Sequence, residues 1–206
     1  MLLALAITLL AGCSRWAGSG RIAARSLRAE PVLVDGRVMT AIYTDLKPET
    51  SFFISDVSLD ELLRGEIRRG LVAHVDLLWI PKAGATPTDS TATNVSIHLI
   101  VVADGELGVY GGAGFASPRN EVGDRRFEIV LEDASLTLLD ATPGFVDWLS
   151  PARLTGRFRA TLDRQHAQQV QRAISQFVTN ALGRSRYVEL SGSDYLAAIE
   201  PILTRR

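Results

Sequence analysis

The chain has 206 residues, of which 47% are hydrophobic and 22% are charged, and its formal net charge at pH 7 is −1. This length and apolar content predict one globular domain with a sizeable core and exclude a largely disordered chain. Nucleic-acid binders carry a marked basic excess, which is missing here, so we expect no nucleic-acid partner.

The N-terminus combines a short apolar run with the only cysteine of the sequence. Residues 2–10 are too few to span a bilayer as a helix, but they have the length of a signal-peptide apolar region. The cysteine, Cys13, ends the stretch LAGC. The rest of the chain has no thiol for disulfides, catalysis or metal binding, which favours an attachment role for Cys13. An N-terminal core helix and an ordinary secretory signal are the alternatives.

The stretch LAGC resembles the lipobox of bacterial lipoproteins. The resemblance implies a signal peptide over 1–12, a diacylglyceryl group on the Cys13 sulfur and usually a second acylation, such as by palmitate, of the new amine. It also implies a lipid-anchored place in the bacterial cell envelope, with the membrane as a partner. Ser14 stands where some bacteria read a retention aspartate, which favours the periplasmic face of the outer membrane over the inner membrane.

Residues 13–30 are predicted to form the lipid anchor and its tether. Trp16 and four arginines in this stretch would suit anionic headgroups, whereas a solvated linker is the simpler alternative. Pro31 marks a natural boundary, so we expect a single domain over 31–206.

The first part of that domain predicts a hairpin, a short helix and a buried strand. Asp35-Gly36 lies between two β-rich runs and is a strong two-residue turn signal. Ser58 and Glu61 have capping-box spacing, which predicts a helix over 59–69 that stops at Gly70. A buried strand is expected over 71–80 and an exposed loop over 81–94.

A second hairpin is predicted around Asp104-Gly105, with each pair of opposite residues summing to 209. In that register one face of the second strand carries Gly108, Tyr110, Gly112 and Gly114. Glycines at alternate strand positions indicate that something approaches the backbone closely, either side chains or a docked helix.

The C-terminal half predicts strands over 126–132, 135–139 and 152–162, followed by an amphipathic helix over 163–182. The arginines that alternate along 152–162 are expected to pair with Glu128 and Glu132, with anion binding as the alternative. The expected fold class is therefore α+β: an antiparallel β-sheet of about six or seven strands with a long C-terminal amphipathic helix packed on one face. Our first choice for that face is the glycine-bearing one.

The sequence holds one candidate metal cluster and no catalytic motif. If His74 pairs with His98, Asp76 faces Ser96, and the two histidines and the carboxylate form a possible zinc-type site. A structural histidine pair is the commoner outcome, so we expect no metal and no cofactor. Neither a nucleophile elbow nor a dinucleotide-binding glycine pattern is present.

An apolar segment over 142–151 lies between two prolines and would serve as a plug at one end of the sheet, or as a lid or contact patch. The leading functional hypothesis is a non-catalytic binding or assembly domain on a membrane-anchored envelope lipoprotein, with an envelope protein as partner. The alternative is a carrier of a lipid or other apolar ligand between sheet and helix. An enzyme or metal site at His74 and His98 ranks third. The ligand-binding residues proposed for the carrier are Tyr110, Gly112, Gly114, Trp148 and Phe177.

Overall fold

The computed structural model describes residues 19–46, 50–81 and 92–185, and these ranges contain nine strands and two helices. Cys13, the predicted signal peptide and most of the loop predicted over 81–94 lie outside the described residues. In chain order the elements are β1 (Ser19–Ser26), β2 (Leu33–Arg37), β3 (Thr40–Thr44), β4 (Thr50–Ser55), α1 (Leu59–Arg64), β5 (Gly70–Leu77), β6 (Val95–Ala103), β7 (Glu106–Pro118), β8 (Arg126–Ala141), β9 (Ala152–Leu162) and α2 (Arg164–Leu182).

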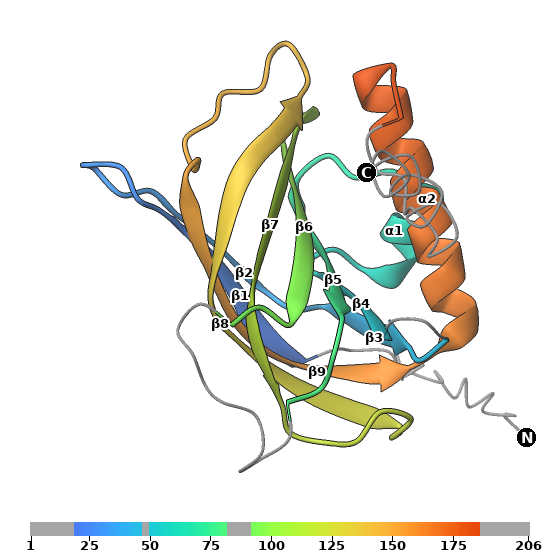
Figure 1. Ribbon diagram of the computed structural model, residues 1–206. Coiled ribbons are helices and arrows are strands. Elements are labelled where there is room, and N and C mark those ends of the chain that lie inside the picture. The colour runs from blue at the N-terminus through green and yellow to red at the C-terminus, as the bar shows by residue number, and fades with distance from the viewer. Residues whose placement is uncertain (1–18, 47–49, 82–91, 186–206) are drawn as a thin grey trace, which may run out of the picture.

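The strands form one curved sheet that closes on itself (Figure 1). Its order is β2-β1-β9-β3-β4-β5-β6-β7-β8, and β8 also pairs with β9. The strands from β9 to β8 in this order therefore form a closed ring, and the β1–β2 hairpin joins it along β9. Within the described sheet all pairings are antiparallel except the short contact between β3 and β9.

The α+β class is confirmed, but two details of the prediction are corrected. The sheet has nine strands instead of six or seven, and α2, with 19 residues, is short beside it. One strand was missed because β1 lies in the stretch predicted to be a tether. Ile22, Ala24 and Ser26 alternate along β1 and are buried, and β1 pairs with β9 along its whole length. Among the described residues the sheet begins at Ser19, so residues 19–26 of the predicted tether are part of the sheet.

Two predicted turns have opposite outcomes. Asp104 and Gly105 both have positive φ, as a type I′ turn requires, and the predicted register between β6 and β7 is confirmed. Asp35 and Gly36, in contrast, lie inside β2 opposite β1, so the predicted turn is wrong. A Cβ at position 36 would press on the Asp56 side chain, so close packing explains this glycine.

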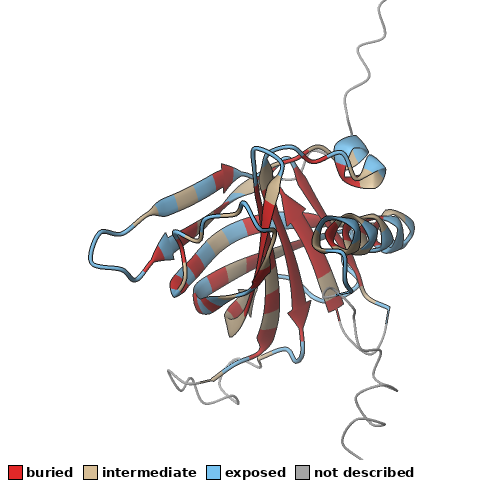
Figure 2. Ribbon diagram, turned by 90° about the horizontal axis from the view of Figure 1, so that it is seen from above, coloured by how far each residue is buried: buried red, intermediate tan, exposed pale blue. Residues whose placement is uncertain are grey.

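The inner face of the closed sheet is apolar and holds one of two clusters of buried residues. Figure 2 shows that buried residues occur along most of the strands. The end at which β1 begins is filled by the rings of Tyr43, Phe52, Phe127 and Phe158, which pack in stacked, tilted and edge-to-face contacts with centroids 5.3 to 6.1 Å apart. The turn between β7 and β8 closes this end, where the Tyr43 hydroxyl donates to the Asp124 carbonyl. We call it the aromatic end, and the opposite end, where β1 finishes, the open end.

Both helices cover the outer face of the sheet. The buried stripe of α2 packs over strand residues that include Phe53, Val72 and Ile100, and α1 lies beside it; the stripe is Ala167, Val170, Ile174 and Val178. Asp163 caps α2 and Gly183 ends it, as predicted. The predicted docking of this helix on the glycine-bearing face is wrong, because that face lines the inside of the closed sheet.

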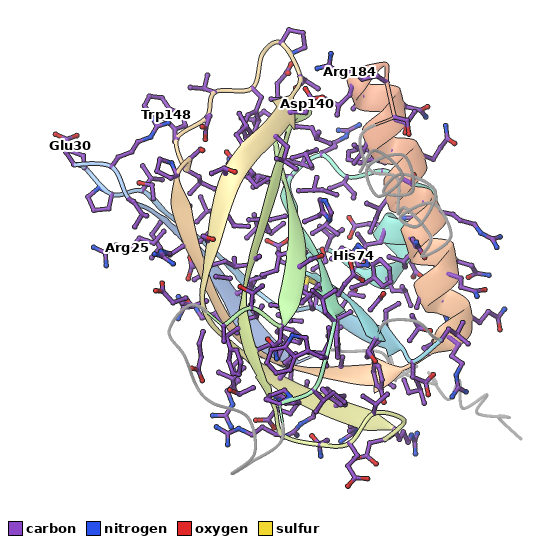
Figure 3. The ribbon with its side chains drawn as sticks, in the orientation of Figure 1. Arg25, Glu30, His74, Asp140, Trp148 and Arg184 are labelled. Atoms are coloured by element: carbon purple, nitrogen blue, oxygen red, sulfur yellow. The ribbon has the colours of Figure 1, made fainter. Side chains whose placement is uncertain are left out.

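The first helix is shorter than predicted. The capping box of Ser58 and Glu61 is present, but the helix ends at Gly65 and not at Gly70. Gly65 takes the left-handed conformation, with φ of 66°, and its N–H bonds back to the last turn. At the far end of α2, Arg184 binds Asp140 of β8, with Nε 2.9 Å from Oδ2, and so ties the helix end to the sheet (Figure 3).

Candidate functional site

A pocket of about 370 Å³ lies at the open end of the closed sheet. Its walls come from β2, the start of β5, the end of β6, Tyr110 of β7 and the loop between β8 and β9. The inner side chains are mostly aliphatic or aromatic; they are Val32, Val34, Leu71, Val101, Tyr110, Phe145 and Leu149. Since the aromatic end of the sheet is filled and closed, the pocket is entered from the open end.

The loop over the pocket is held by Asp147. Its Oδ1 accepts the Tyr110 hydroxyl at 2.8 Å and the backbone N–H groups of Leu149 and Ser150 at 3.0 and 2.9 Å. Arg28, at the tip of the β1–β2 hairpin, lies 3.5 Å from Oδ2 and donates to the Ser150 carbonyl. Burial and the neighbouring Asp147 carboxylate raise the pKa of Tyr110, so this hydroxyl stays protonated and remains a donor. One carboxylate therefore joins the pocket wall, the loop and the hairpin.

Phe145 covers the pocket from the same loop because position 108 carries no side chain. A Cβ at Gly108 would overlap the Phe145 ring, and this ring meets Tyr110 edge to face at 6.3 Å. The close approach expected at the glycine-bearing face is thus made here by an aromatic ring. At Gly112 and Gly114 it is made by β8, since a Cβ would overlap the Ser135 carbonyl or Ala134.

The rim of the pocket is apolar and exposed. Trp148 is 60% exposed, Val146 58% and Leu33, beside the pocket-lining residues of β2, 59% (Trp148 is labelled in Figure 3). Isolated apolar residues on a surface are ordinary, but a group around a pocket mouth marks a contact or entry site. The segment 142–151 therefore buries Leu149 against the sheet and exposes Val146 and Trp148 at the rim.

Asp35, Asp56 and Arg69 supply the charges at the pocket wall. Asp56 accepts the Leu71 N–H at 2.7 Å and is wedged against Gly36 and Gly70, where a Cβ would press on its carboxylate. Burial raises the pKa of Asp56, although the Leu71 hydrogen bond opposes that effect. The hydrogen bond from the Leu71 backbone N–H explains why the Asp56 carboxylate is tolerated at an apolar wall.

The structure divides the five residues predicted for the carrier site. Tyr110 and Trp148 both line the open-end pocket. Gly112 and Gly114 pack against β8 and do not line it. Phe177 lies on α2, in a separate groove between α1 and α2 of about 530 Å³. The carrier site was predicted to lie between the sheet and α2. That position is wrong, because α2 lies on the outer face and its buried side chains pack directly on the strands.

The register considered for the metal cluster is present, with His74 opposite His98 and Asp76 opposite Ser96. His74 is buried on the outer face between the sheet and α2, stacked on Phe53 at 4.6 Å, and its Nε2 lies 3.0 Å from Asp76 Oδ1 (Figure 3). Burial alone would raise the pKa of Asp76, but the His74 ring and the Ser51 hydroxyl outweigh it and hold that pKa below its ordinary value.

This cluster has the geometry of a structural pair. The His74 and His98 ring centroids are 6.4 Å apart, and within the described ranges no group of three histidine, cysteine or acidic side chains is placed to hold a metal ion. The predicted cross-strand pairing of arginines is found at Glu128, which binds Arg157 and Arg159, whereas Arg153 binds Asp133 and not Glu132.

Most pocket residues were missed from the sequence. Val34, Leu71 and Val101 read as ordinary strand residues, and their shared position depends on pairings between distant strands. The available signal was the apolar segment 142–151, which indicated the right end of the sheet.

The chain matches no protein-family model, no curated protein sequence and no solved structure. In the part of the chain that the structure describes, neither helix has the length and apolar character needed to cross a membrane.

Proposed function

We propose that this chain is a membrane-anchored envelope lipoprotein whose closed sheet binds an apolar ligand at its open end. The observation that carries the binding role is the pocket itself. It is of the size that small-molecule sites occupy, its inner wall is apolar, and its rim exposes Trp148 and Val146. This is the carrier hypothesis with its site moved from the outer face of the sheet to the inside.

The residues of the wall favour binding over catalysis. Among the described residues that line the pocket there is no serine, cysteine, histidine or lysine, and the Tyr110 hydroxyl is engaged by Asp147. The buried pair of His74 and Asp76 lies on the other face of the sheet, beneath the helices. A nucleophile and its base within reach of one ligand are the minimum for acyl-transfer chemistry, and these groups do not meet that condition.

The proposal of a lipid anchor is based on the stretch LAGC, and the start of the sheet limits how far the anchor can lie from the domain. Only five residues separate Cys13 from Ser19, so at about 3.5 Å per residue the anchored sulfur stays within roughly 20 Å of the sheet. Such a tether would hold the domain close to the bilayer. We place the protein on the periplasmic face of the outer membrane because Ser14 follows the cysteine.

Small molecules extracted from the full chain, purified from its own cells, provide the test. We expect mass spectrometry to find a reproducible apolar compound, which is released without breaking the covalent anchor. The variant Val34→Trp places an indole in the pocket and should lose that compound. Ala173→Trp, which adds the same group to the groove between α1 and α2, is the matched control and should retain it.

The proposal fails if the native chain yields no compound, or if Val34→Trp yields as much as the native chain. A partner protein recovered through the exposed rim in place of a small molecule would favour the assembly role, since Trp148 and Val146 are also suited to a protein contact.

A further inference from the structure

The two ends of the closed sheet differ in their relation to the chain that leads to Cys13. β1 begins with Ser19 opposite Arg159, near the end of β9, and finishes with Ser26 opposite Ala152. Ser19 therefore lies toward the aromatic end, and the pocket lies at the other. Seven residue steps of about 3.3 Å separate the two ends of β1, or roughly 23 Å.

The aromatic end exposes apolar side chains directly after β5. Leu78 is 46% exposed, Trp79 38% and Ile80 44%, so three consecutive residues form an apolar surface here. Leu46, after β3, and Val122, in the turn between β7 and β8, expose further apolar surface at the same end. Consecutive exposed residues of this kind have no role in the core of the sheet.

Trp79 has the character of a membrane-interface residue. Its indole N–H donates to the Thr93 carbonyl at 3.0 Å, and its ring contacts Phe115 edge to face with centroids 6.1 Å apart. The polar atom is thus satisfied by the protein, and the ring is held in place with part of its surface exposed. Tryptophan with these properties is enriched where an apolar phase meets water.

The charges of the adjoining turn are compatible with an anionic surface. Arg119, Arg125 and Arg126 are exposed and form no ion pair with the described residues. Arg119 and Arg125 match the two acidic residues of the turn, Glu121 and Asp124, and Arg126 at the start of β8 adds a third positive charge. Arginines close to a membrane surface are attracted by anionic lipids, so this turn does not oppose contact with a bilayer.

We propose that the aromatic end of the sheet rests on the bilayer surface, with Leu78, Trp79 and Ile80 in contact with lipid. The occupant is lipid because the chain from Cys13 enters the sheet at this end and is too short to carry the anchor far from it. The inference depends on the lipid anchor proposed above. The pocket then opens away from the anchoring membrane, and its ligand exchanges with a donor or acceptor in the aqueous space.

Tryptophan quenching in the lipidated full chain tests this orientation. In a Trp16→Phe background, Trp148→Phe leaves Trp79 as the reporter, and Trp79→Phe leaves Trp148. Both chains are placed in vesicles of phosphatidylethanolamine and phosphatidylglycerol that contain lipids brominated near the headgroup. We expect about a twofold loss of Trp79 emission, as for an interfacial indole, and almost none for Trp148. Replacing Leu78 and Ile80 by Asp should reduce the quenching of Trp79.

Each other result has a defined meaning. Quenching of Trp148 and not Trp79 would show that the pocket faces the bilayer, and absence of quenching at both would show that the domain stands away from it; either overturns the orientation. The Cys13→Ser chain separates the anchor from the contact. If the native chain fails to remain on vesicles, or Cys13→Ser remains equally well, the anchor proposal fails and the orientation with it. Vesicle-bound native protein with unquenched Trp79 overturns the orientation alone.

Discussion

Asp147→Ala is expected to lower the free energy of unfolding by about 3 kcal/mol and to loosen the loop over the pocket. The buried Tyr110 hydroxyl would lose its acceptor, which by itself costs about 1 to 3 kcal/mol, and two backbone N–H groups would lose theirs. Urea unfolding measures the stability, and hydrogen exchange at Leu149 and Ser150 reports the loop. Those amides should exchange much faster in the variant, while amides in β4 and β5 should keep their protection.

A double-mutant cycle with Tyr110→Phe separates the hydroxyl from the rest of the loop. Tyr110→Phe alone removes the donor and leaves an acceptor that other groups still use, so a smaller loss of about 1 kcal/mol is expected. In the double variant no hydroxyl is left without an acceptor. Its loss of unfolding free energy should therefore be smaller than the sum of the losses in the two single variants. Losses that add within about 0.5 kcal/mol would show that Asp147 does not hold the loop through Tyr110.

Asp76→Ala is expected to cost about 3 to 5 kcal/mol, because it removes one partner of a buried pair. The carboxylate contacts His74 Nε2 and accepts the Ser51 hydroxyl at 2.6 Å, and both groups lie on the face covered by the helices. The exposed pair of Arg64 and Glu66 provides the control. Glu66→Gln should change the stability by less than about 1 kcal/mol, and an equal loss for both variants would contradict a special role for Asp76.

The contribution of Asp76 should depend on pH in a defined direction. Its pKa in the folded protein lies below the ordinary value of 3.8, so the ionised form is favoured by folding. This contribution is full at pH above the unfolded-state pKa and is lost as the pH falls through the folded-state pKa. The difference in stability between the native chain and Asp76→Ala should therefore shrink as the pH falls below about 4.

Local features of this fold could be predicted from the sequence because their causes lie within a few residues. The turn at Asp104-Gly105 follows from the backbone that it requires, and the register of β6 and β7 follows from the turn. The ends of α2 follow from Asp163 and Gly183, which cap it. The loop between β5 and β6 allows several registers of these strands. The sequence therefore does not decide that His74 lies opposite His98.

Closure of the sheet could not be predicted in the same way. It depends on β9, which pairs with β8 on one side and with β1 and β3 on the other, and the residues involved are far apart in sequence. β1 is short and contains a glycine and two arginines, so the alternation of Ile22 and Ala24 is too brief to distinguish a strand from a basic tether. The turn signal at Asp35-Gly36 failed for the same reason, since the partner of β2 is β1.

Closure also explains why the site was only half predicted. Both faces of β6 and β7 are apolar, one inside the ring and one beneath the helices, and a glycine-bearing face is not by itself an inner or an outer face. The helix was therefore assigned to the wrong side. Tyr110 and Trp148 were identified from local patterns, whereas Leu71 and Val101 become pocket residues only when the ends of the strands meet.

Titration of the purified chain with a dansyl-labelled eleven-carbon acyl chain tests the central claim, that the open end of the sheet is a site for an apolar ligand. Dansyl emission should rise and saturate at one probe for each chain. Val34→Trp should weaken this binding at least about tenfold, or roughly 1.4 kcal/mol, while Ala173→Trp leaves it unchanged. Emission that never saturates, or an equal affinity for the native chain and Val34→Trp, would contradict binding in this pocket.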